Sequence, residues 1–103
     1  MVSDKVEQFR EKYPSITQFF LSRIYDFPEY SYEKIVKEYC EVKKAQEFTE
    51  VVQEIKAILL LKSFPWYEIR KTANRYFKTP EETKEWLKYI LSLLEKYKYL
   101  VKK

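Results

Sequence analysis

Residues 79–97 read TPEETKEWLKYILSLLEKY and carry the clearest helix signal in the chain. Thr79 is a preferred N-cap residue, Pro80 stands at the first helical position, and Glu82 follows at the third. This order is a capping box, in which the threonine and glutamate side chains satisfy backbone N–H groups of the first turn. Apolar residues then recur at helical spacing. They predict the buried stripe of the last helix: Trp86, Leu87, Ile90, Leu91, Leu94 and Tyr97.

Helical periodicity also runs through the segments that precede this stretch. The first helix is expected over 4–13. An interruption is expected over 47–49, because an unbroken helix of about 30 residues is unusual in a small domain. We therefore expect helices to start at or just after these capping residues and prolines: Ser3, Pro14, Ser31, Thr49, Pro65 and Thr79.

The absence of glycine bears on the fold class. Tight hairpin turns need positive φ, which glycine adopts most easily, and no stretch alternates cleanly between apolar and polar residues. The sequence therefore predicts an all-α protein with one domain over residues 1–103. We expect a compact bundle of about five to six helices, with a trihelical, helix-turn-helix-like C-terminal half.

Composition excludes most familiar enzyme classes. The 103 residues contain no histidine, no glycine and a single cysteine, Cys40. Phosphate-binding loops and dinucleotide fingerprints need glycine, and serine–histidine triads need histidine. One cysteine cannot form an intrachain disulfide, a four-cysteine zinc site or an iron–sulfur cluster. We expect a protein that is not an enzyme and that holds no metal and no cofactor.

Composition also bears on location. The longest apolar run, over 57–61, is far too short to span a bilayer, and the N-terminus lacks the apolar core of a signal peptide. We expect a cytoplasmic protein that does not contact membranes. Abundant Lys and Glu, with scarce Asn, Cys and Met, favour a thermophilic source.

Basic charge is concentrated in one segment. Residues 62–78 hold five basic side chains and one acidic side chain, whereas the other 86 residues hold fifteen of each sign. If the fifth helix extends to residue 78, two of the lysines share one stripe with an aromatic ring and an amide, and the two arginines flank it. Such a face suits phosphates, with the amide and the ring free to contact a base or sugar. We define the basic stripe as the candidate nucleic-acid- or nucleotide-binding residues Tyr67, Arg70, Lys71, Asn74, Arg75 and Lys78. The alternative is an ordinary solvated helix face.

The C-terminal half resembles the trihelical core of helix-turn-helix and winged-helix proteins. The resemblance rests on residues 66–70, WYEIR, and on residues 80–84, PEETK. It implies a DNA-binding transcription regulator whose last helix enters the major groove. This chain departs from the family pattern in lacking the turn glycine. It also places Glu81, Glu82 and Glu85 where a recognition helix approaches phosphates.

A second resemblance covers residues 48–94, with residues 62–69, KSFPWYEI, as its central turn. This stretch is similar to the helical C-terminal domain of the archaeo-eukaryotic primase large subunit. It is also similar to the non-catalytic third primase subunit of Sulfolobales, which looks like that domain without its iron–sulfur cluster. The resemblance implies an accessory subunit of DNA replication that helps bind the initiating nucleotide and the template, with a protein partner in the replication complex.

Three classes of function stay open: a nucleic-acid- or nucleotide-binding accessory of replication, a helix-turn-helix regulator, and a helical protein–protein adaptor. A regulator dimerises and prefers particular sequences, whereas an accessory tolerates many sequences and responds to triphosphates. An adaptor binds neither nucleic acid nor nucleotide.

Overall fold

The computed structural model describes residues 4–26 and 31–102, and the regular elements in these two ranges are all helical. The all-α prediction is therefore confirmed. No helix in these ranges is long and apolar enough to cross a membrane. The two described ranges contain six α-helices in chain order: α1 (Asp4–Lys12), α2 (Pro14–Phe19), α3 (Tyr32–Val42), α4 (Ala45–Leu59), α5 (Trp66–Ala73) and α6 (Pro80–Lys96). A π-helical segment, η1 (Phe20–Ile24), continues α2, and a 3₁₀ turn, η2 (Lys98–Leu100), follows α6.

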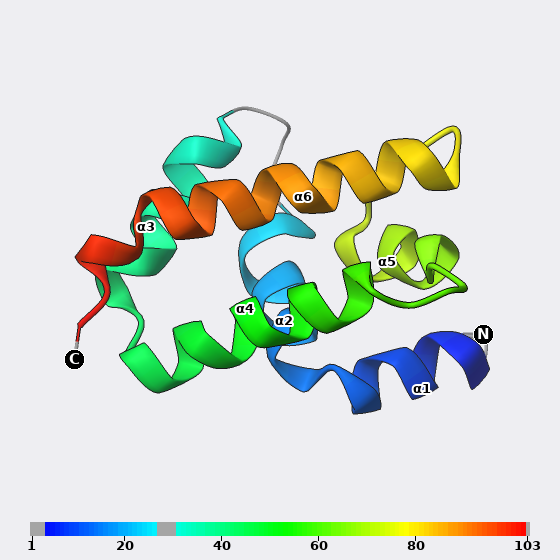
Figure 1. The fold of residues 1–103 in the computed structure, drawn as a ribbon, viewed down its shortest axis with the longest axis horizontal. Coiled ribbons are helices and arrows are strands. Elements are labelled where there is room, and N and C mark those ends of the chain that lie inside the picture. The colour runs from blue at the N-terminus through cyan, green and yellow to red at the C-terminus, as the bar shows by residue number, and fades with distance from the viewer. Residues whose placement is uncertain (1–3, 27–30, 103) are drawn as a thin grey trace.

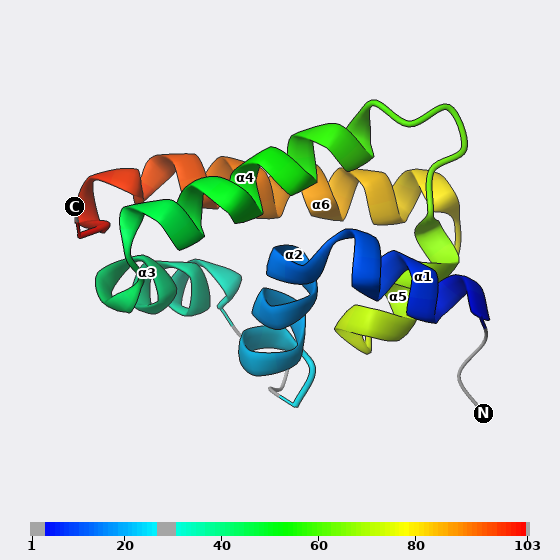
Figure 2. The same ribbon diagram turned by 90° about the horizontal axis from the view of Figure 1, so that it is seen from below.

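Helices α4 and α6 contact each other and run in opposite directions along the long axis of the molecule (Figure 1). Helix α3 packs against α6, and α2 packs against α4. Helices α1 and α5 contact each other at one end of the long axis, whereas α3 and the C-terminal end of the chain lie at the other end (Figure 2). Helices α4, α5 and α6 form the expected C-terminal succession, and α1 and η1 complete the packing around α5.

The hydrophobic core draws on every long helix and on η1. Burial of an aliphatic or aromatic side chain contributes roughly 1.5–3 kcal/mol, so these residues supply most of the drive to fold. On the last helix, Leu87, Ile90 and Leu94 are fully buried, and the rest of the predicted stripe lies partly buried beside them. The largest fully buried side chains are Ile16, Phe19, Phe20, Ile24, Val36, Val51, Ile55, Ile58, Ile69, Leu87, Ile90 and Leu94.

Two predicted N-caps are confirmed. The Thr79 hydroxyl accepts a hydrogen bond from the Glu82 backbone N–H at 3.1 Å, and Pro80 stands at the first position of α6. The Ser31 hydroxyl accepts one from the Lys34 N–H at 3.2 Å, which starts α3. The predicted cap at Ser3 lies outside the described residues.

The break between the third and fourth helices was predicted in the wrong place. Thr49 lies inside α4, and the chain instead becomes extended at Lys43 and Lys44. Backbone hydrogen bonds to the C-terminal segment keep these two residues extended. The Ala45 N–H donates to the Lys102 carbonyl at 2.8 Å, and the Lys102 N–H donates to the Lys43 carbonyl at 3.4 Å. A partner so distant in the sequence leaves no local signal at the break.

The first helix ends at Lys12, one residue earlier than predicted. Tyr13 has φ −123° and ψ 66°, which lies outside the helical region. The cause is Pro14, because a proline ring disfavours the helical conformation of the residue before it.

Candidate nucleic-acid interface

The basic stripe does not lie on one continuous helix, so the prediction that α5 extends to residue 78 was wrong. Helix α5 ends at Ala73, and Asn74 adopts the left-handed conformation, with φ 54° and ψ 49°. In a chain without glycine, asparagine is the residue that best tolerates this conformation at a helix C-terminus. The single asparagine of the protein is therefore a helix terminator. Its side-chain Nδ2 also donates to the Tyr25 carbonyl at 3.2 Å.

The termination of α5 creates a shallow hollow of about 410 Å³, which we call the α5 hollow. It is lined by Tyr25, Arg70, Lys71, Asn74, Arg75 and Tyr76. The structure thus brings together four residues of the basic stripe, even though they do not share one helix face. Lys78 is exposed beyond the end of α5 and is not among the described lining residues.

Two tyrosines of the α5 hollow were missed by the sequence analysis. Tyr76 stands directly after Arg75, so its aromatic ring beside a basic residue was a signal available in the sequence. Tyr25 follows η1 and reaches the hollow from a distant part of the chain. Local patterning carries no information about that contact.

Arg70 is surrounded by aromatic rings. Its guanidinium carbon lies 5.8 Å from the ring centroid of Trp66, 5.9 Å from that of Tyr67 and 5.6 Å from that of Tyr76. Lys71 Nζ lies 5.6 Å from the Tyr67 centroid. Tyr67 is thus placed beside the hollow by its contacts with both cations. Cation–π contacts of this kind hold an arginine head group in a limited range of positions.

Arg75 was predicted to be an exposed cation, and this prediction was wrong. Only 9% of the residue is exposed. Its Nε donates to the Tyr32 hydroxyl at 2.7 Å, and its Nη1 donates to the Asn74 carbonyl at 3.2 Å. The left-handed turn at Asn74 allows Arg75 to reach Tyr32 at the start of α3, and this contact buries it. Arg75 therefore forms a wall of the hollow.

The electrostatics of the α5 hollow combine two opposing terms. Among the described lining residues three are basic and none is acidic, which favours anions. The hollow also lies at the C-terminal end of α5, where unpaired backbone carbonyls give the helix a partial negative charge. Arg70 and Lys71 stand in the last turn and offset that charge. The full charges of Arg70 and Lys71 exceed a partial dipole charge of about one half, so the balance at the end of α5 favours an anion.

A second hollow, of about 420 Å³, lies between α2 and α4 and has a different character. Glu47 and Glu50 line it, together with Lys43 and Tyr39. Burial raises the pKa of the Tyr39 hydroxyl, with a smaller contribution from the charge of Cys40. The mixture of carboxylates and one amine makes this hollow unsuited to phosphate.

Cys40 is fully buried, and burial raises the pKa of its thiol to about 11. A thiol with a raised pKa holds little thiolate near neutral pH, so it lacks the form that attacks electrophiles or binds metals. The chemistry of Cys40 is therefore that of a small apolar core residue.

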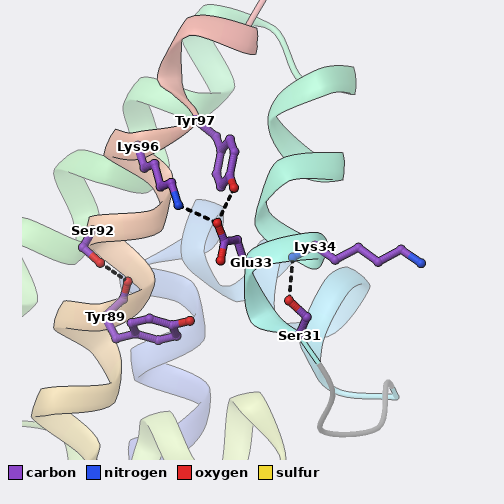
Figure 3. A network of polar contacts seen from close by, with 7 residues as sticks. All are labelled: Ser31, Glu33, Lys34, Tyr89, Ser92, Lys96 and Tyr97. Carbon is purple, nitrogen blue, oxygen red and sulfur yellow. Dashed lines mark hydrogen bonds and ion pairs between the residues drawn. The ribbon is translucent and has the colours of Figure 1, made fainter.

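Two lysines of the C-terminal region have structural roles. Lys96 Nζ donates to Glu33 Oε1 at 2.5 Å, and the Tyr97 hydroxyl donates to the same oxygen. Figure 3 shows both side chains reaching from the end of α6 toward the first turn of α3. The backbone of Lys102 pairs with the segment before α4. These contacts join the end of the chain to α3 and α4.

The start of α6 bears on the helix-turn-helix interpretation. Glu81 and Glu82 lie exposed in its first turn, and Glu85 is exposed one turn later. Carboxylates at this position repel the phosphates between which a recognition helix inserts. Their acidic side chains instead complement the helix dipole at the N-terminus of α6.

Comparison with known proteins found no match for this chain among protein-family models, curated proteins or solved structures.

Proposed function

We propose that this protein is a non-catalytic nucleic-acid- or nucleotide-binding accessory module, and that the α5 hollow binds the phosphates. The observation that carries the proposal is that Arg70 and Lys71 both line one hollow whose described lining contains no acidic side chain. The residues outside 62–78 balance their charges to zero, and three of the five basic residues of that segment line the hollow.

The three cations are suited to different tasks. Arg70 presents a planar fork of N–H donors that matches two phosphate oxygens, and its three aromatic neighbours limit the positions it can take. Lys71 is exposed and acts as a movable point charge. Arg75 is held by Tyr32 and contributes positive charge from the wall of the hollow. Arg70 and Lys71 together can neutralise about two phosphates.

The more specific form of the proposal is a primase accessory subunit that works in the cytoplasm with protein partners of a replication complex. Its support is the resemblance of residues 48–94 to the primase large-subunit domain. A helix-turn-helix regulator is the less favoured form, because Glu81 and Glu82 stand at the exposed start of α6. An adaptor draws support from Leu60, which is 84% exposed after α4.

The test is fluorescence anisotropy with labelled oligonucleotides and a double charge reversal, Arg70→Glu with Lys71→Glu. Each lost charge-assisted contact is worth roughly 1.5–3 kcal/mol, so affinity should fall by at least about 100-fold. For wild type, log K should fall against log salt with a slope of roughly −2 on duplex, and less on single strands. Arg75 is excluded from the reversal because its burial couples it to stability.

The matched control is Lys98→Glu with Lys102→Glu, which changes net charge equally near the C-terminal end of the chain, where both side chains are exposed and which lies away from α5. The control should retain most of the affinity. Equal losses from both pairs would mean that overall charge alone drives binding. No loss from either pair would remove the α5 hollow as the site and leave the adaptor as the leading interpretation.

A further inference from the structure

Tyr76 is exposed in a way that packing does not explain. The residue is 73% exposed, whereas Tyr39, a core tyrosine, is 2% exposed. Among the described residues, the ring contact recorded for Tyr76 is with the Arg70 guanidinium, 5.6 Å from the ring centroid. An aromatic ring held beside a cation and otherwise open to solvent is a surface on which a planar group can stack.

Tyr76 is accompanied by two more partly exposed tyrosines. Tyr25 lines the same hollow, and Tyr67 contacts both Arg70 and Lys71. Aromatic rings and cations are therefore both present at the α5 hollow. This is the combination used by proteins that bind single strands, in which basic groups follow the phosphates and aromatic rings stack on successive bases.

We propose that the α5 hollow binds an unpaired nucleotide of a single strand, with its base stacked on Tyr76 and its phosphates on Arg70 and Lys71. This inference rests on the proposed function. In a duplex each base is covered by its neighbours, so its face is closed to a tyrosine ring. A single strand exposes those faces without the cost of opening base pairs. More than one ring and more than one cation surround the hollow, which favours a strand over a free mononucleotide.

The experiment compares three probes by fluorescence anisotropy at about 50 mM salt. They are an oligothymidine of about 12 nucleotides, an abasic strand of equal length and a duplex of equal length. Wild type should bind oligothymidine at least about tenfold more tightly than either of the other probes. Tyr76→Ala should weaken oligothymidine binding by about 5- to 100-fold and leave abasic binding within about twofold, while Tyr76→Trp should retain oligothymidine binding.

The control variant is Tyr99→Ala, because Tyr99 is similarly exposed, at 76%, and lies near the C-terminus. It should bind every probe like wild type. Unchanged oligothymidine binding by Tyr76→Ala would overturn the stacking inference, as would tighter wild-type binding to duplex. Displacement of the labelled strand by thymidine monophosphate at the same concentration would show that a free nucleotide binds as well as a strand. That result would overturn the proposed preference for a single strand.

The two proposals fail in different ways. If Arg70→Glu with Lys71→Glu abolishes binding while Tyr76→Ala does not, phosphate binding at the hollow stands and base stacking is refuted. If wild type binds no probe at low salt, the stacking proposal and the nucleic-acid-binding form of the proposed function are both refuted.

Discussion

The Arg75 guanidinium lies against the Tyr32 ring, 5.7 Å from its centroid, and its Nε donates to the Tyr32 hydroxyl at 2.7 Å. This contact joins the turn after α5 to the first residue of α3. The Tyr32 ring in turn meets Trp86 of α6 edge-on, with ring centroids 5.9 Å apart. A side chain that resembles a surface cation in the sequence thus connects α5 to the aromatic part of the core.

Arg75→Ala should destabilise the protein. Removing a hydrogen bond that involves a charged group costs roughly 1.5–3 kcal/mol, and here the Tyr32 hydroxyl also loses its described partner. Urea denaturation should show this loss in the free energy of unfolding. Lys71→Ala is the control, because Lys71 is exposed at the end of α5 and should cost less than about 1 kcal/mol. Equal losses would contradict a structural role for Arg75.

Substitution of Asn74 tests the left-handed turn. Asn74→Ala should lower the free energy of unfolding by about 1–2 kcal/mol, because a β-carbon without a compensating polar group disfavours positive φ. Asn74→Gly should cost less, since glycine adopts this conformation freely and loses only the bond to the Tyr25 carbonyl. Thermal denaturation can rank the variants. An alanine variant as stable as wild type would show that the left-handed turn is not required.

Glu54 replaces the missing cap of α2. Its Oε1 accepts from the Ile16 N–H at 2.8 Å, and its Oε2 accepts from the Ser15 N–H at 3.2 Å. No side-chain hydrogen bond comes from Tyr13, the N-cap residue itself. Glu54→Ala should therefore cost about 1.5–3 kcal/mol, measured by urea denaturation. Gln53→Ala, at an exposed position of the same helix, is the control and should change stability by under about 0.5 kcal/mol.

The Glu33 network should make stability depend on pH at both extremes. The Lys96 ammonium and the Tyr97 hydroxyl lower the pKa of Glu33, and Glu33 in turn raises the pKa of Lys96 and of Tyr97. The contribution of Glu33 is complete above its ordinary value of 4.5 and is lost as pH falls through its lowered pKa. The contributions of Lys96 and Tyr97 are complete below 10.5 and 10.0 and are lost as pH rises through their raised pKa values.

Glu33→Gln should flatten the dependence of the free energy of unfolding on pH in both windows, as measured by denaturation across pH. Glu41→Gln is the matched control, because Glu41 is an exposed carboxylate on the same helix. A Glu33→Gln profile parallel to that of wild type at both ends would show that the network does not couple to folding.

Sequence predictions were correct where the interacting residues lie close together in the sequence, and wrong where they lie far apart. The caps at Thr79 and Ser31 were predicted correctly because each hydroxyl bonds a backbone N–H three residues later. The apolar stripe of α6 was recognisable because helical spacing alone places Leu87, Ile90 and Leu94 on one face. Four residues of the α5 hollow were found for a similar reason, because they lie close together in the sequence.

The sequence by itself thus determined the all-α class, the helix starts that carry local caps or prolines, and the region where basic charge gathers. Only the tertiary structure decided that Arg75 is buried, that the chain is extended at Lys43 and Lys44, and that Tyr25 lines the hollow. Each of these depends on a contact with a distant segment: Arg75 with Tyr32, Lys43 with Lys102, and Asn74 with Tyr25. Such partners meet only when the apolar faces of the helices have packed, so the physical cause lies outside any local window of sequence.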